Sequence, residues 1–160
     1  MEFNELFEMQ RELDTFIENT QQINRDVFKE KGLALMIELA ELANETRCFK
    51  FWSTKGPSER EVILEEFVDS IHFLLSLGNE KGLSLKAWPE VKQKEDLTNW
   101  FLRTQEAILT FIQNPTMNSY QSVWQYYGVL AFNLNFTLED IIQAYLAKNE
   151  KNYERQRNGY

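Results

Sequence analysis

An all-α helical bundle is the fold that the sequence predicts, and three observations lead to it. Apolar residues make up 43% of the 160 residues and aromatic residues 14%, which is enough for a sizeable core. Only three prolines and six glycines interrupt the chain, which favours long helices over many short strands. Apolar residues recur at helical spacing, and no stretch alternates with the period of a strand. We therefore expect about six helices in a single domain over residues 1–160.

Helix-breaking and helix-capping residues divide the chain into these helices. The clearest loop is "STKGPSER", residues 53–60, where Gly56 and Pro57 break the helix. Ser58 is a good N-cap for the helix that follows, and Glu61 would complete a capping box. Gly78 is expected to end that helix, and Thr137 with Asp140 indicates another N-cap near the end of the chain. The helices are expected at residues 3–20, 27–47, 59–77, 95–113, 119–133 and 137–152.

Charge and cysteine content limit the classes of partner and the compartment. A formal net charge of −8 argues against unaided binding to nucleic acid or to an anionic membrane. Cys48 is the single cysteine, so an internal disulfide is excluded and a reducing compartment is favoured. The acidic N-terminus has no signal-peptide pattern, and no apolar run is long enough to span a membrane. A cytoplasmic protein with no membrane and no nucleic-acid partner is expected.

Two pairs of carboxylates lie inside apolar helical segments. Glu38 and Glu41 belong to "ELAELANE", and Glu66 and Asp69 belong to "LEEFVDSIHFLL". A spacing of three residues places both members of each pair on one helix face. A single pair of this kind is usually a solvated surface, but burial among apolar residues is costly unless a cation meets the charges. Two such pairs on adjacent antiparallel helices predict four carboxylates that converge on a cation site.

The residue types at this site favour magnesium. Carboxylate oxygens without imidazole or thiolate are the ligands that Mg²⁺ prefers. His72 is the single histidine, so neither an ordinary zinc site nor a di-iron site built from two Glu-x-x-His pairs is available. Glu45 lies one turn beyond Glu41 on the same face. It is expected to be either a further ligand of the ion or a residue that contacts the ligands without touching the ion.

These motifs resemble the dimeric all-α dUTPase family, within the wider group of all-α nucleoside triphosphate pyrophosphatases related to MazG. The wider group shares the two acidic pairs. The dUTPases add an "FK-x-W" run, here Phe49 to Trp52, and a "D-x-x-HF" ending, here Asp69 to Phe73. Their C-terminal motif is matched by "YLAKNEKNYERQRNGY", and Gln10 matches an early motif in which Asp14 replaces the more frequent Asn.

The resemblance implies a homodimeric enzyme, a dUTP diphosphatase. It implies hydrolysis of dUTP, and of dUDP, to dUMP by a metal-activated water, with two or three Mg²⁺ ions held by the four carboxylates. By similarity, Glu38 is expected to accept the proton of the water. Lys148, Arg155 and Lys50 are expected to hold phosphate oxygens, and Asn149 and Asn152 to contact phosphate or sugar. Gln10 and Trp52 would contact the uracil, Asp14 the uracil N3–H or the sugar, and His72 the base or the deoxyribose.

Two alternatives remain open from the residues alone. The first is a MazG-like pyrophosphatase that acts on another nucleotide such as dCTP, because the replacement at Asp14 bears on base selectivity. The second is a helical protein that binds a nucleotide or a protein partner without turnover. Clustered acids and the tail cations Lys148 and Arg155 argue against the second alternative, because a non-catalytic bundle has no physical need for them.

Overall fold

The computed structural model describes all 160 residues and contains six helices and no strands, so the predicted all-α fold is confirmed. None of the helices is both long and apolar enough to cross a membrane. The helices are α1 (Glu5–Gln21), α2 (Phe28–Thr46), α3 (Arg60–Glu80), α4 (Leu97–Gln113), α5 (Met117–Asn133) and α6 (Leu138–Arg157).

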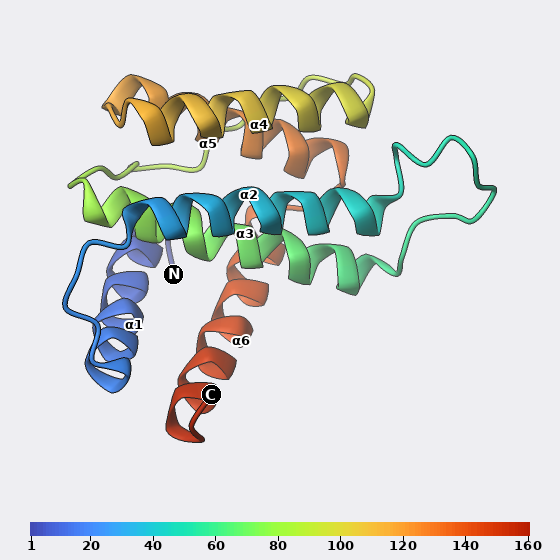
Figure 1. Cartoon of the computed structure of the whole chain (residues 1–160). Helices are drawn as coiled ribbons and strands as arrows, with labels where there is room; N and C mark the ends of the chain where they lie inside the picture. Colours follow the sequence, from blue (N-terminus) through green and yellow to red (C-terminus); the bar gives the residue numbers. More distant parts are fainter.

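Helices α2 and α3 lie antiparallel in the middle of the molecule (Figure 1). The pair α4 and α5 packs on one side of them, and α1 and α6 extend from the other side. The loop between α2 and α3, residues 47–59, projects beyond the ends of both helices. The sides of α2 and α3 that face α1 and α6 are therefore the place where residues from both ends of the chain can meet.

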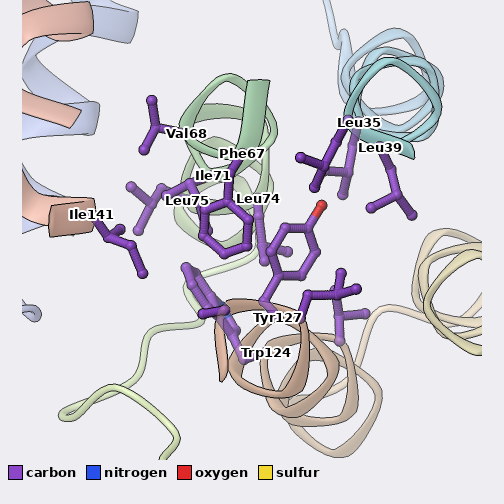
Figure 2. Packing of buried hydrophobic residues seen from close by; sticks show 14 of the residues in the cluster. Leu35, Leu39, Phe67, Val68, Ile71, Leu74, Leu75, Trp124, Tyr127 and Ile141 are labelled. Atoms are coloured by element: carbon purple, nitrogen blue, oxygen red, sulfur yellow. The ribbon is translucent and has the colours of Figure 1, made fainter. Parts of the chain in front are cut away.

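Helix α3 is the centre of the hydrophobic core. Its Phe67, Ile71, Leu74 and Leu75 are fully buried, and they face residues from α2, α5 and α6 (Figure 2). A helix that is apolar on most of its faces is stable only when other helices surround it. This position fixes α3 rigidly, and polar residues on its remaining face are fixed with it.

Two expected helix boundaries on α3 are wrong. Ser58 does not cap the helix, because Glu59 is the N-cap residue. The Ser58 backbone N–H instead donates to the Glu45 backbone oxygen, and the Ser58 hydroxyl donates to the Glu45 carboxylate. Gly78 does not end the helix, which continues to Glu80. A Cβ at Gly78 would lie 2.1 Å from the Tyr120 hydroxyl, so this glycine allows close packing of α5 rather than a turn.

The N-terminal signal of α6 is confirmed, because Thr137 and Asp140 form a reciprocal capping box. The helix ends later than expected, at Arg157 instead of residue 152. No glycine or proline interrupts the sequence before Gly159, so the helix continues through the basic tail. This extension places Arg155 on the same rigid helix as Lys148.

Candidate active site

Three of the four expected metal ligands meet between α2 and α3. Glu38, Glu66 and Asp69 each offer one carboxylate oxygen, and these oxygens all lie within 4.8 Å of one another. Glu41 adjoins Glu38 and Glu66 from a solvent-exposed position at the rim of the group. We call Glu38, Glu41, Glu66 and Asp69 the acidic cluster.

Burial and mutual repulsion hold protons on the acidic cluster. Burial, with the charges of Asp69 and Glu41, raises the pKa of Glu38 to about 8. The same causes raise the pKa of Glu66 to about 7. Burial also raises the pKa of Asp69, although the neighbouring Lys148 ammonium opposes the change. Such shifts show that the cluster lacks sufficient positive charge when only protein groups surround it.

The donor set fits a hard divalent cation. One oxygen of Glu38 and one of Glu66 are buried without any hydrogen-bond partner, which is costly for a carboxylate. All ligand atoms are carboxylate oxygens, as Mg²⁺ requires, and no thiolate or imidazole that would favour zinc belongs to the cluster. A bound cation would satisfy the free oxygens and remove the repulsion.

Lys148 faces the acidic cluster from α6. Its Nζ lies 3.0 Å from Asp69 and 2.7 Å from Glu65, and its side chain is almost completely buried. Lys151 lies further away, 3.7 Å from Glu65. Glu65 was not predicted as a site residue, because an acid beside Glu66 in the sequence gives no signal of a partner on α6.

A cavity of about 370 Å³ adjoins the acidic cluster and is lined by residues of α1, α2, α3 and the end of α6. Seven of its lining residues had expected roles: Gln10, Asp14, Glu38, Asp69, His72, Asn152 and Arg155. The buried Asn149, which was also expected to contact the substrate, does not line it. Lining residues that were not predicted are Leu13, Ile17, Lys31, Phe73, Ser76, Gln156 and Tyr160.

A hydrogen-bonded group forms the polar wall of this cavity. The Gln10 side-chain oxygen accepts from His72 Nδ1 at 2.7 Å and from the Tyr145 hydroxyl at 2.8 Å. The Gln10 amide nitrogen donates to Asp14 at 2.9 Å. Burial lowers the pKa of His72 to about 3, so the imidazole is neutral. Tyr145 was matched to a motif in the sequence without a role, and only its contact with Gln10 gives it one.

The site thus combines carboxylates suited to Mg²⁺, a buried lysine, a partly buried arginine and a cavity with an amide wall. This combination suits a nucleoside polyphosphate. The family model described as dUTPase matches residues 2–160, almost the whole chain. This chain belongs to the dUTPase family. It is an enzyme, a dUTP diphosphatase, and the all-α fold is the one expected for that family. No curated protein matches the chain.

The tail of this dUTPase covers one end of the cavity. The Arg155 guanidinium lies 5.1 Å from the centre of the Tyr160 ring and donates to the Asn152 side-chain oxygen at 3.4 Å. Gln21 at the end of α1 donates to Gln156 at 2.7 Å and to the Tyr160 backbone oxygen at 3.3 Å. Both ends of the chain therefore contribute to the mouth of the cavity.

Two residues with expected roles in substrate binding lie elsewhere. Lys50 and Trp52 belong to the projecting loop and do not line the cavity. The Trp52 side chain is 64% exposed and contacts Phe49 and Phe51 edge to face. Within one dUTPase chain, the "FK-x-W" run is thus an exposed aromatic group rather than a wall of the site.

Proposed function

We propose that this dUTPase hydrolyses dUTP to dUMP and pyrophosphate, and dUDP to dUMP and phosphate, in a reaction that depends on Mg²⁺. The observation that carries the proposal is the convergence of Glu38, Glu66 and Asp69, with unpartnered carboxylate oxygens, beside a cavity of nucleotide size. With Glu41 at the rim, these residues would hold two or three ions. When bound, Mg²⁺ neutralises phosphate charge and lowers the pKa of water.

Glu38 is the group proposed to accept the proton of the attacking water. Glu38 and Asp69 both contribute to the group of three oxygens and line the cavity, but Asp69 is paired with Lys148, whereas Glu38 has no cationic partner. Burial, together with repulsion from Asp69 and Glu41, raises the pKa of Glu38, so cations at the cluster would lower the pKa and leave the carboxylate ionised. An ionised carboxylate within reach of the water is what general base catalysis requires.

Lys148 and Arg155 are proposed to hold phosphate oxygens. Lys148 lies against Asp69 at the inner end of the site, and Arg155 lines the cavity two helical turns further along α6. Charge-assisted hydrogen bonds from these groups would stabilise the negative charge that develops on the leaving phosphate. Asn152 lines the cavity near Arg155 and would contact phosphate or sugar. Asn149 is buried and does not line the cavity, so it would support the substrate-binding residues rather than contact the substrate directly.

The polar wall is proposed to hold the base. Gln10 and Asp14 present an amide donor next to a carboxylate acceptor, which matches a uracil carbonyl next to its N3–H. His72 lines the same wall, and its Nε2 atom is buried without a protein partner. It would accept a hydrogen bond from the base or from the deoxyribose.

A nucleotide panel tests the proposed reaction. Product release from dUTP, dUDP, dCTP, dTTP, dATP, dGTP and UTP would be measured with Mg²⁺ and with excess chelator. We expect Mg²⁺-dependent formation of dUMP, and a loss of at least about a hundredfold in kcat for Glu38→Gln. Turnover in the presence of chelator, or full activity of Glu38→Gln, would contradict the metal mechanism.

Glu30→Gln is the matched control for this experiment. Glu30 is an exposed glutamate at the start of the same helix, where it pairs with Arg25 away from the cavity. This variant should keep wild-type activity and Mg²⁺ dependence. A preference of the wild-type enzyme for dCTP would keep the metal site and would show that the assignment of Gln10 and Asp14 to uracil is wrong.

We also propose that the enzyme is a homodimer that associates through α2 and α4. Leu33 and Ile37 on α2 are more than half exposed, and Leu102 and Leu109 on α4 are exposed as well. The two helices lie close together, since a Cβ at Gly32 would lie 2.8 Å from Ile112. Adjacent apolar stripes of this kind are typical of interfaces between subunits.

Light scattering on a size-exclusion column tests the dimer. The double substitution Leu102→Glu and Leu109→Glu should shift the protein to the mass of one chain. Met117→Glu, at an apolar residue of similar exposure on α5, is the control and should leave the dimer intact. A wild-type protein that elutes as a monomer at micromolar concentration would refute the proposed interface.

A further inference from the structure

Gln10, on which recognition of the base would depend, is a side chain whose amide has two orientations. The two orientations place a hydrogen-bond donor and an acceptor at exchanged positions, so they would select opposite partners on a base. Gln10 is 3% exposed, so surrounding protein groups rather than solvent decide between them.

Two donors from two other helices meet the Gln10 oxygen. His72 on α3 and Tyr145 on α6 both donate to it, and their rings are stacked with centroids 4.2 Å apart and planes inclined by 18°. Because a carbonyl oxygen has two lone pairs, these donors use its capacity completely. One hydrogen of the Gln10 amide nitrogen is used by Asp14, which leaves the other as a free donor.

The reversed amide would be unfavourable on every side. Its oxygen would face the Asp14 oxygen, and its nitrogen would face the His72 Nδ1–H. The Tyr145 hydroxyl would have to rotate to accept from that nitrogen, and its own hydrogen would lose the partner that it has now. Reversal would also require His72 to move its proton from Nδ1 to Nε2. The present arrangement leaves Nε2 unprotonated, in agreement with a buried atom that has no acceptor nearby.

We propose that Tyr145 and His72 are positioning residues that hold the Gln10 amide so that its free N–H selects a base with a carbonyl oxygen. This inference rests on the proposed function. Uracil offers a carbonyl at C4 beside an N3–H, which complements the Gln10 donor and the Asp14 acceptor. Cytosine offers an amino group and an unprotonated N3, which would place donor against donor and lone pair against carboxylate. A locked amide therefore rejects cytosine, and a freely rotating amide does not.

Tyr145→Phe tests the positioning role, because it removes one donor and keeps the stacked ring. We expect the ratio of kcat/KM for dUTP to that for dCTP to fall about tenfold or more, through a higher KM for dUTP and a lower KM for dCTP. The value of kcat for dUTP should change little, since Tyr145 contacts neither the acidic cluster nor Lys148. An unchanged ratio would overturn the proposal.

Tyr120→Phe is the matched control for the loss of a buried hydroxyl. The Tyr120 hydroxyl donates to the Leu74 backbone oxygen at 2.7 Å, so its removal also costs one buried hydrogen bond. This variant should lose stability as Tyr145→Phe does but should keep the wild-type ratio of dUTP to dCTP. An equal loss of discrimination in both variants would show that destabilisation, and not amide orientation, is the cause.

The imidazole proton provides a readout that needs no substrate. His72 is the single histidine of the chain, so its ring nitrogens can be assigned without ambiguity by nitrogen-15 NMR. We expect the Nδ1–H form in the wild-type protein and a mixture of both forms in Gln10→Leu. A wild-type ring in the Nε2–H form would overturn the proposed orientation. If the wild-type protein did not hydrolyse dUTP, the proposed function would fail, while the ring proton would still decide the orientation of the amide.

Discussion

The ammonium nitrogen of Lys148 lies 3.0 Å from a carboxylate oxygen of Asp69, one of the three carboxylates that converge at the proposed metal site. A lysine in this position competes with a metal ion for the same oxygen, and its charge repels cations from the cluster. The same lysine is also proposed to hold phosphate. Without nucleotide it therefore shields the acidic cluster, and with nucleotide it can turn to the substrate.

Lys148→Met should separate these two effects. We expect tighter binding of Mg²⁺ to the nucleotide-free protein, measured by calorimetry, because Asp69 loses a competing cation. We also expect a fall in kcat for dUTP of about 10²- to 10³-fold, because a donor to the phosphate is lost.

Lys151→Met is the control for that experiment. Lys151 is half exposed and lies 3.7 Å from Glu65, with no contact to Asp69. Both Mg²⁺ affinity and kcat should stay near the wild-type values. If Mg²⁺ binding weakened in Lys148→Met, the idea of competition for Asp69 would be wrong.

The pH dependence of stability follows from the acidic cluster. Glu38 and Glu66 have folded-state pKa values of about 8 and about 7, against 4.5 for an ordinary glutamate. Between about pH 6.5 and pH 8 the folded metal-free protein therefore binds more protons than the unfolded chain, and raising the pH lowers its free energy of unfolding. Below this window the buried neutral His72 acts in the opposite direction, because its folded-state pKa is about 3.

Calorimetry with a chelator should show a Tm that falls across this window. Added Mg²⁺ should remove the fall, and Glu38→Gln should raise the Tm of the metal-free protein at pH 8, because it removes one repelling charge. A Tm that rises with pH in the chelated protein would contradict the repulsion argument.

Tyr160→Ala should weaken substrate binding without affecting the chemical step. The ring lies over the Arg155 guanidinium at the mouth of the cavity, and such an exposed contact contributes about 0.5–1 kcal/mol. We expect KM for dUTP to rise about two- to fivefold with kcat unchanged. A fall in kcat without a change in KM would instead place the tail in the chemical step.

Gly128→Ala should destabilise the whole bundle. A Cβ there would lie 2.2 Å from the Pro89 backbone oxygen, so the connection before α4 would have to move. Denaturant unfolding should show a loss of about 1–3 kcal/mol. Gly56→Ala is the control, because no atom lies within 4 Å of its Cβ position, and it should change the free energy of unfolding by less than about 0.5 kcal/mol.

The helices and the acidic cluster could be predicted because their signals are local. Apolar spacing marks the helices, and the two acidic pairs converge once a loop joins α2 and α3 as antiparallel neighbours. Contacts between distant segments left no such signal. Tyr145 meets Gln10 across 135 residues of sequence and Lys148 meets Glu65 across 83, and only the packing of α6 against α1 and α3 aligns them.

Ser58 shows why a strong local signal can still fail. Its sequence context fits an N-cap, but its donors bond to Glu45 across the loop, so tertiary contacts override the capping preference. The position of Trp52 was beyond prediction for a related reason. Aromatic residues at the end of a helix usually pack into a core, whereas this one is exposed on the projecting loop.

The dependence of the cavity on both α1 and α6 has a consequence for synthesis on the ribosome. A nascent chain that ends before α6 can already bury much of α3, but it lacks Lys148, Arg155 and Tyr145. The carboxylates of α2 and α3 would then face one another without the lysine that shields them, and Gln10 would lack one of its two donors. Such a partial chain would have no competence for turnover. Activity would therefore appear in one step when the last helix emerges and docks, and a chain cut short before that helix would be inert toward the cell's nucleotides.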